Sequence, residues 1–562
     1  MKFSQTFGKG SRRLVAVFFA GLTLLGGAEP NDEIARLQAT VAAQQKQLDT
    51  LQRMMEQQQR LLERAIGSAS ASTLRFNPSD VASASPVIPV TPTATGALAL
   101  PAQKAQPGPA SSANPTAPRN PCERSLESNP VPPYLRLGNT CIAPIGFMDL
   151  TAVWRDKNAG SGIGSNFGGV PYINGVPGNL SEFRFSPQNS RIGFRADGEW
   201  KGTHFIGYNE FDFLGTSASN GLGVTNGAFV PRLRLFWVNA RKGSWEFLGG
   251  QSWSMLTPNR KGISALPGDL FYSHVIDVNY MAGLTWTRQP GVRVLYHPNQ
   301  TVTLGVSLEN PNQYAGGQAG APKITPPAAL ASFLGTQLDD TSTGALSTPN
   351  LAPDIIVKVA FDPSSKLHAE IAGIERTFRT YNPATYQHVT KPGAGISLNA
   401  NVELLKDFRV VTNNFWSDGG GRYLFGQAPD VIIRADGSLS PIHSGGTVDG
   451  LEWTIKNTLL YAYYGGIYIG RNTALDADGK SLVGYGFSGS SNTQNRAINE
   501  VTFGFNQTMW RDPRYGAINV MGQYEWLQRD PWSVATGAPK AAHDNTIYFN
   551  LRYTLPGSIP NF

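Results

Sequence analysis

The sequence is poor in charge, in cysteine and in long apolar runs. Charged residues make up 15% of the 562 residues, and the chain has two cysteines. Beyond the N-terminal segment no apolar run reaches the length of a membrane-spanning helix, which argues against a helical membrane protein. The seven histidines are scattered, and no G-x-S-x-G or H-E-x-x-H motif occurs. We therefore expect no enzymatic activity, no catalytic residues, no cofactor and no metal site.

One segment resembles the start of a calcium-binding loop. Asp476-Ala477-Asp478 has the acidic spacing, but Phe487 stands where the loop needs a bidentate acid. The net charge of +7 also raises the alternative of nucleic-acid binding. The chain has no lysine-rich arm to support it, and we expect no nucleic-acid partner.

What the sequence has in abundance is short segments with one apolar face. In residues 302–309, valine and leucine alternate with threonine, glycine, serine and glutamate. Side chains of a strand alternate between its two faces, so one face of this segment is apolar and the other polar. About sixteen such strands are expected at 145–154, 189–200, 204–213, 229–240, 244–254, 283–297, 300–309, 354–361, 367–378, 393–404, 407–417, 449–460, 464–473, 496–509, 515–527 and 543–555.

The connections between these segments alternate in length. Short turns such as 201–203 and 241–243 alternate with long loops such as 155–188, 255–280 and 310–352. Short periplasmic turns and long external loops are typical of an outer-membrane barrel. The sequence thus predicts an all-β chain whose residues 145–562 form a transmembrane antiparallel β-barrel in the bacterial outer membrane, in contact with its lipid. Tryptophans expected in the girdles at its ends are Trp200, Trp237, Trp245, Trp286, Trp416 and Trp526.

The N-terminus has the pattern of an export signal. Basic residues at 9–13 precede an apolar core at 14–25 and the small residues Gly26-Gly27-Ala28. This pattern predicts a signal peptide at 1–28, cleaved after Ala28, with a retained anchor helix as the alternative.

Residues 29–66 show a heptad pattern. Its a positions are Ile34, Val41, Leu48, Met55 and Leu62, and its d positions are Leu37, Gln44, Leu51, Gln58 and Ala65. Such spacing indicates a periplasmic coiled coil, and we favour a homotrimer. The alternative is a single amphipathic helix lying on a surface.

Residues 67–144 form a linker rich in proline, alanine and serine, which cannot bury a core. Cys122 and Cys141 lie in its last part. In an exported protein two cysteines are expected to form one disulfide, here a structural staple before the first strand.

Arginines alternate with apolar residues along several of the expected strands. In 230–239, Arg232 and Arg234 share one face, while Leu233, Leu235 and Trp237 share the other. If the apolar face meets lipid, the inward pore-lining residues are Arg191, Arg195, Arg232, Arg234, Arg293, Glu210 and Asp212. Arginine inside a narrow channel selects anions. Alternatively, these arginines pair with Glu210, Asp212 and Glu246 and only make the wall rigid.

The loop at 255–280 carries several large apolar residues, which favour packing over free exposure. We expect it to fold into the barrel and narrow it, so that Arg260, Lys261 and Asp269 belong to a constriction. The alternative is that this loop packs on a neighbouring protomer or on the barrel rim.

The heptads at 34–65, S-P-Q-N-S-R-I-G-F at 186–194 and S-L-E-N-P at 307–311 resemble the DcaP-like outer-membrane porins of the trimeric general-porin superfamily. The resemblance implies a trimer of sixteen-stranded barrels, a periplasmic coil and a preference for small anionic solutes. By position, the basic lumen of that family would correspond to Arg191, Arg195, Arg232, Arg234 and Arg293.

One departure from outer-membrane barrels lies at the C-terminus. Pro556, Gly557 and Pro560 interrupt the apolar alternation that usually runs up to a terminal aromatic residue, here Phe562.

The leading hypothesis is an outer-membrane porin, a passive diffusion channel for small hydrophilic solutes with a preference for anions. The alternative is a structural anchor whose coiled coil tethers the barrel to the cell wall.

Overall fold

We describe the fold from a computed structural model of the chain. It describes residues 134–215, 229–316, 323–332, 337–338, 350–382, 385–512 and 514–556. The expected signal peptide, coiled coil, most of the linker and Cys122 lie outside these residues. No helix in this part of the chain is long and apolar enough to cross a membrane.

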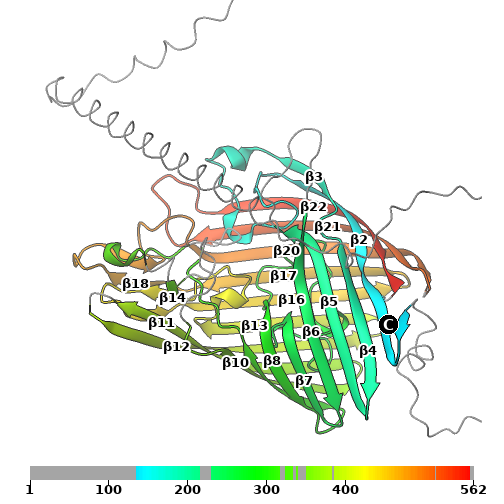
Figure 1. Cartoon of the computed structure of the whole chain (residues 1–562). Helices are drawn as coiled ribbons and strands as arrows, with labels where there is room; N and C mark the ends of the chain where they lie inside the picture. The colour runs from blue at the N-terminus through cyan, green and yellow to red at the C-terminus, as the bar shows by residue number, and fades with distance from the viewer. Residues whose placement is uncertain are drawn as a thin grey trace, which may run out of the picture. The chain divides into compact units, whose positions relative to one another are not determined.

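The described residues form one antiparallel sheet that closes on itself (Figure 1). Its wall has sixteen strands, and residues 147–155 of the first pair with residues 546–554 of the last. The wall strands are β2 (Thr140–Arg155), β4 (Arg191–Trp200), β5 (Thr203–Gly215), β6 (Val230–Lys242), β7 (Trp245–Trp253), β8 (Arg288–Tyr296), β9 (Val302–Glu309), β10 (Asp354–Ser364), β11 (Leu367–Asn382), β12 (Gln387–Leu405), β13 (Phe408–Asp418), β16 (His443–Ile455), β17 (Thr458–Ile469), β20 (Asn495–Asp512), β21 (Gly516–Pro531) and β22 (Ala542–Thr554). The predicted β-barrel is confirmed.

Shorter elements flank this wall. The short strands are β1 (Leu135–Leu137) and β3 (Glu182–Ser186), both paired with β2, and two hairpins, β14 (Val431–Ile433) with β15 (Leu439–Pro441) and β18 (Asn472–Leu475) with β19 (Leu482–Tyr485). The short helices are η1 (Phe167–Gly169), η2 (Val176–Asn179), η3 (Pro267–Asp269), η4 (Ala328–Leu330) and η6 (Gly421–Tyr423).

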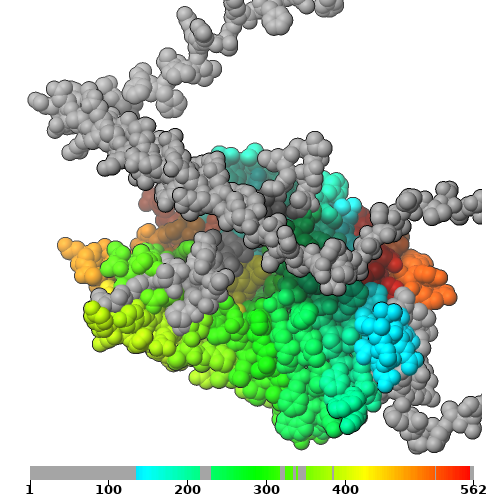
Figure 2. Space-filling view, in the orientation of Figure 1, coloured from blue at the N-terminus to red at the C-terminus, as the bar shows by residue number. Residues whose placement is uncertain are grey.

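The alternation read from the sequence holds along most strands. In β9, Leu304, Val306 and Leu308 are exposed on the outer face, whereas Ser307 and Glu309 are buried on the inner face. Figure 2 shows the green part of the outer surface, within residues 200–360, as one continuous wall. A wall that is apolar outside and polar inside suits lipid on one side only.

Three expected boundaries are wrong. The strands expected at 449–460 and 464–473 are β16 and β17, which turn at Lys456-Asn457 instead of 461–463. Lys456 has a φ of 54°, the left-handed conformation that a two-residue hairpin turn requires. The strand expected at 283–297 starts only at Arg288, because 283–287 lie inside the barrel. The first wall strand begins at Thr140 rather than 145, within the expected linker.

A β-bulge in β6 overturns part of the inference drawn from 230–239. Glu210 pairs with Leu235 and Phe211 with Leu233, so Arg234 is an extra residue. Beyond a bulge the side chains change faces, because one residue has been inserted into the alternation. Leu235 and Trp237 are therefore buried inside, where Trp237 stacks on Tyr208 with ring centroids 5.2 Å apart.

The prediction that Leu235 and Trp237 face lipid is wrong; Phe236 and Val238 take that place. Trp286 also lies in the interior rather than in a girdle. Trp200 and Trp245 are exposed on the outer face, as expected.

Candidate functional site

Residues 254–287, here called the interior hairpin, fold into the barrel as expected for the 255–280 loop. The backbone N–H groups of its first limb donate to carboxylates of the wall. Met255 donates to Glu309 over 2.7 Å, and Asn259 donates to Glu370 over 3.1 Å. These bonds satisfy buried backbone donors, so they hold the limb against β9 and β11.

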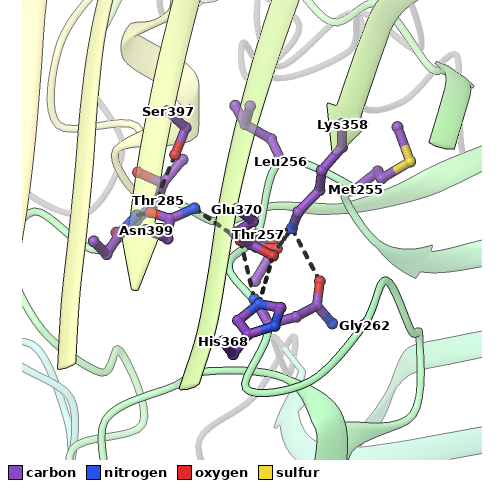
Figure 3. Close-up of polar contacts among 12 residues, drawn as sticks. Met255, Leu256, Thr257, Gly262, Thr285, Lys358, His368, Glu370, Ser397 and Asn399 are labelled. Atoms are coloured by element: carbon purple, nitrogen blue, oxygen red, sulfur yellow. Dashed lines mark hydrogen bonds and ion pairs between the residues drawn. The ribbon is translucent and has the colours of Figure 1, made fainter. Parts of the chain in front are cut away.

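A buried ionic network strengthens this attachment (Figure 3). The Lys358 ammonium lies 2.8 Å from Glu370 and donates to the carbonyl of Thr257 over 2.9 Å. His368 lies between Glu370, at 3.2 Å, and Asp362, at 2.8 Å. Removing either partner of such a buried ion pair would destabilise the protein, because the remaining charge would be left unpaired.

The second limb of the hairpin is attached to other strands. Ile276 donates its N–H to Gln523 of β21, and Ala282 donates to Glu500 of β20. Thr285 donates to Asn413 of β13. Since the two limbs contact widely separated strands, the hairpin crosses the lumen.

The three expected constriction residues differ in their surroundings. Arg260 is bound by both carboxylate oxygens of Glu452, at 2.6 and 2.8 Å, so its charge is compensated. Lys261 is exposed, whereas Asp269 is half-buried. Burial raises the pKa of the Asp269 carboxyl above its ordinary value, although Lys261 opposes the shift.

Strands β4, β5, β6 and β8 bring together a cluster of charged side chains. This arginine cluster consists of Arg191, Arg232, Arg234, Arg288, Glu210 and Asp212. Arg234 lies 2.6 Å from Glu210 and 2.7 Å from Asp212. Arg232 lies 2.7 Å from Asp212, and Arg191 lies 3.7 Å from Glu210. The pairing that we set out as the alternative is therefore present for Glu210 and Asp212. Glu246 instead accepts a hydrogen bond from Asn239 over 2.6 Å and lies 3.1 Å from His297.

Arg288 is the member that the sequence analysis missed. Its guanidinium carbon lies 5.6 Å from the ring centroid of Trp253 and 5.7 Å from that of Trp286. No carboxylate among the described residues lies within ion-pair distance of it, and its Nε has no hydrogen-bond partner there. Four guanidinium groups thus face two carboxylates, and the arginine cluster has a net positive charge.

Tyr280 of the interior hairpin contacts the arginine cluster, and its pKa is shifted by the positive charge there. Its hydroxyl accepts hydrogen bonds from Arg234, at 3.3 Å, and Arg191, at 3.4 Å. Burial alone would raise the pKa of the Tyr280 hydroxyl. Arg191, Arg234 and Arg288 together outweigh burial, and the pKa lies below its ordinary value.

Two of the five predicted arginines lie apart from the arginine cluster. Arg195 pairs with Asp197 of its own strand at 2.7 Å. Arg293 is buried under the interior hairpin, where it donates to the backbone carbonyl of Trp253 over 2.6 Å. The structure thus brings together Arg191, Arg232 and Arg234 but does not extend them into a ladder through Arg293.

Strands β4 and β6 carry two arginines that water can reach. Arg232 is 41% exposed and Arg195 is 35% exposed, whereas Arg234 is buried. Opposite walls, including β9, β10 and β11, have their inward polar groups covered by the interior hairpin. Charge that water can reach therefore lies along β4–β6, and smaller exposed fractions remain at Arg409 of β13, 29%, and Arg552 of β22, 21%.

The described residues offer no metal centre: no group of three or more His, Cys, Asp and Glu side chains there is arranged to hold an ion. The Asp478 carboxylate accepts hydrogen bonds from Lys480 and Ser481 of its own turn. Cys141 is disulfide-bonded, and Cys122, the other cysteine of the chain, lies outside the described residues.

The sequence matches no known family profile and no curated protein. Solved structures do resemble it. The outer membrane channel DcaP of Acinetobacter baumannii superposes with a TM-score of 0.54 at 16% identity, over 75% of this chain and 100% of that one.

An anion-selective porin from Comamonas acidovorans gives a TM-score of 0.41 at 11% identity, over 74% of this chain and 99% of its own. Salmonella typhi OmpF gives 0.42 at 7% identity, over 75% and 100%. On the first of these resemblances, the chain has the fold of the DcaP outer membrane channel, as the sequence motifs had suggested.

Proposed function

We propose that this protein is an outer-membrane porin, a passive diffusion channel for small hydrophilic solutes that prefers anions. The observation that carries the proposal is the arginine cluster, which places four guanidinium groups against two carboxylates inside a closed barrel. No chemical step is involved.

Charge of one sign inside a narrow channel admits permeants of the opposite sign. The effect is larger in a barrel than in bulk water, because the protein walls lower the effective dielectric constant. Glu210 and Asp212 fix the directions of Arg232 and Arg234, so these guanidinium groups do not need to reorganise when an anion passes.

Because the interior hairpin occupies part of the lumen, we propose that only small solutes pass. It leaves water-exposed charge along β4–β6, and we propose that solutes pass there, between Arg232 near the long-loop end and Arg195 near the short-turn end. Arg260 and Lys261 would border this path from the hairpin side.

The remaining parts of the proposal follow from the sequence. Residues 1–28 are proposed as a signal peptide, 29–66 as a periplasmic coiled coil that supports a homotrimer, and Cys122 as the disulfide partner of Cys141. The short turns would face the periplasm and the long loops the exterior.

Liposome swelling tests the proposal. Vesicles that contain the full-length protein should swell in small neutral sugars at rates that fall with sugar size. They should swell faster with an organic anion than with an organic cation of matched size. No swelling with any solute would refute the channel and favour the anchoring alternative.

A further inference from the structure

The short turns at one end of the barrel share a charge pattern that solute passage does not require. Five of them carry a lysine, and this lysine rim consists of Lys201, Lys242, Lys366, Lys406 and Lys456. All five side chains are exposed. Within the described residues, no carboxylate lies within ion-pair distance of any of them.

Each lysine of the rim lies close in sequence to large apolar side chains of the outer belt. Leu405, which precedes Lys406, is 70% exposed, and Trp200, which precedes Lys201, is 64% exposed. Lys242 is followed by the exposed Trp245. Aromatic and aliphatic residues at such positions lie at the level of the lipid headgroups.

One lysine shows on which side of the wall its charge lies. The ammonium of Lys201 is 4.8 Å from the ring centroid of Trp200, and this ring is on the outer face. The charge is therefore held on the lipid side of the rim rather than over the mouth of the lumen.

The opposite end of the barrel is different. Lys157 there lies 3.5 Å from Asp156, and Lys480 shares its hairpin turn with Asp476 and Asp478. Acidic residues thus accompany these two lysines. In the lysine rim only Lys406 shares its turn with an acidic residue, Asp407, so the five turns together have a net positive charge.

We infer that the lysine rim binds the phosphate groups of anionic phospholipids in the leaflet that surrounds the short-turn end. Long lysine side chains keep their stems on apolar surface and place the ammonium among headgroups, where anionic phosphate is the complementary charge. The inference rests on the proposed function in one respect, namely that the barrel spans a membrane with its short turns at the periplasmic leaflet.

The test compares lipid preference in three forms of the full-length protein. The rim variant is K201Q/K242Q/K366Q/K406Q/K456Q. The control variant removes the same charge from exposed positions near the long-loop end, K323Q/K391Q/R434Q/K480Q/K540Q. Tryptophan quenching by brominated phosphatidylglycerol, relative to brominated phosphatidylcholine, gives the preference of each form for the anionic lipid.

In wild type and the control variant, each lysine that contacts a phosphate should raise the affinity for phosphatidylglycerol over phosphatidylcholine by about fivefold. This preference should become smaller at high salt, which screens the charges. The rim variant should show almost no preference. Replacing the same five lysines by arginine should preserve the preference, because the charge is kept. Heat-modifiable migration on gels verifies that every variant has folded.

Equal preferences in wild type and the rim variant would overturn the inference. Loss of binding to purified cell-wall sacculi in the rim variant, with lipid preference unchanged, would also overturn it and assign the rim to the cell wall. Conductance is recorded on the same samples. If wild type does not conduct but still prefers the anionic lipid, the proposed channel function is refuted, whereas lipid binding by the lysine rim is upheld.

Discussion

The sharpest prediction concerns Arg288, whose guanidinium has no carboxylate partner among the described residues. Replacing it by glutamine removes one positive charge and leaves the Glu210–Arg234 and Asp212–Arg232 pairs intact. An anion passing about 6 Å from one unit charge is stabilised by about 0.7 kcal/mol at the dielectric constant of water, and by about 3 kcal/mol at an effective value of about 20. At about 0.1 M salt, screening reduces the smaller value to about 0.4 kcal/mol, a twofold effect.

The same charge destabilises a passing cation by the same free energy by which it stabilises an anion. The permeability ratio of chloride to potassium should therefore fall by about fourfold or more in Arg288→Gln. The assay is the reversal potential of single channels in a planar bilayer under a salt gradient. Arg434→Gln is the matched control, because the Arg434 side chain is exposed on a long loop, where it donates to the Ser440 hydroxyl. An unchanged ratio in Arg288→Gln, or equal falls in both variants, would refute the reasoning.

Three further predictions concern the hairpin, a loop and the bulge. Arg260→Ala removes the arginine partner of the buried Glu452 carboxylate and leaves it with Tyr463, at 2.7 Å, and His274, at 3.6 Å. The cost is at most about 3–5 kcal/mol, and single-channel recordings should show a larger and noisier current; an unchanged current would mean that the Arg260–Glu452 pair does not hold the hairpin. Burial raises the pKa of Asp430 to about 6 from 3.8, despite opposing arginines. Because the folded-state value is the higher one, its contribution to stability is complete below about pH 4 and is lost as the pH rises through about 6. Thermal unfolding should show wild type less stable at pH 7 than at pH 5, and Asp430→Asn should reduce that difference; an undiminished difference would contradict the assignment. Because the bulge turns Phe236 to the lipid face and Trp237 to the interior, Phe236→Cys should react with a lipid-soluble maleimide and Trp237→Cys should not. The opposite result would contradict the bulge.

Much of the wall could be predicted from the sequence because the bilayer imposes a simple rule. Every spanning strand must be apolar on its lipid face, and this period of two is visible in 302–309 without knowledge of its neighbours. Turn positions were harder to predict. The run from Leu459 to Tyr464 is apolar and aromatic throughout, so alternation did not reveal that the turn precedes it at Lys456-Asn457.

The arginine cluster was predictable only in part. Parity placed Arg191 and Arg232 on the face opposite their outward neighbours, as in the structure, because Arg191 precedes the outward Ile192 and Arg232 precedes the outward Leu233 with no bulge in between. Parity failed after Arg234, where an inserted residue exchanges the two faces. A bulge leaves no signal in a single sequence when both faces carry large apolar residues.

Arg288 was missed for a different reason. By parity with the outward Val292 it would face lipid, but it is the first residue of β8, where the chain leaves the interior hairpin. Its environment is set by Trp286, two residues earlier in the hairpin, and by Trp253, the last residue of β7, which pairs with Arg288. The contact with Trp253 depends on strand pairing, which local spacing does not encode.

The measurement that tests the central claim most directly is the reversal potential of the wild-type channel under a potassium chloride gradient. The net positive arginine cluster predicts a potential of the sign that chloride permeation gives. A potential of the opposite sign would contradict the account, even if the barrel conducts.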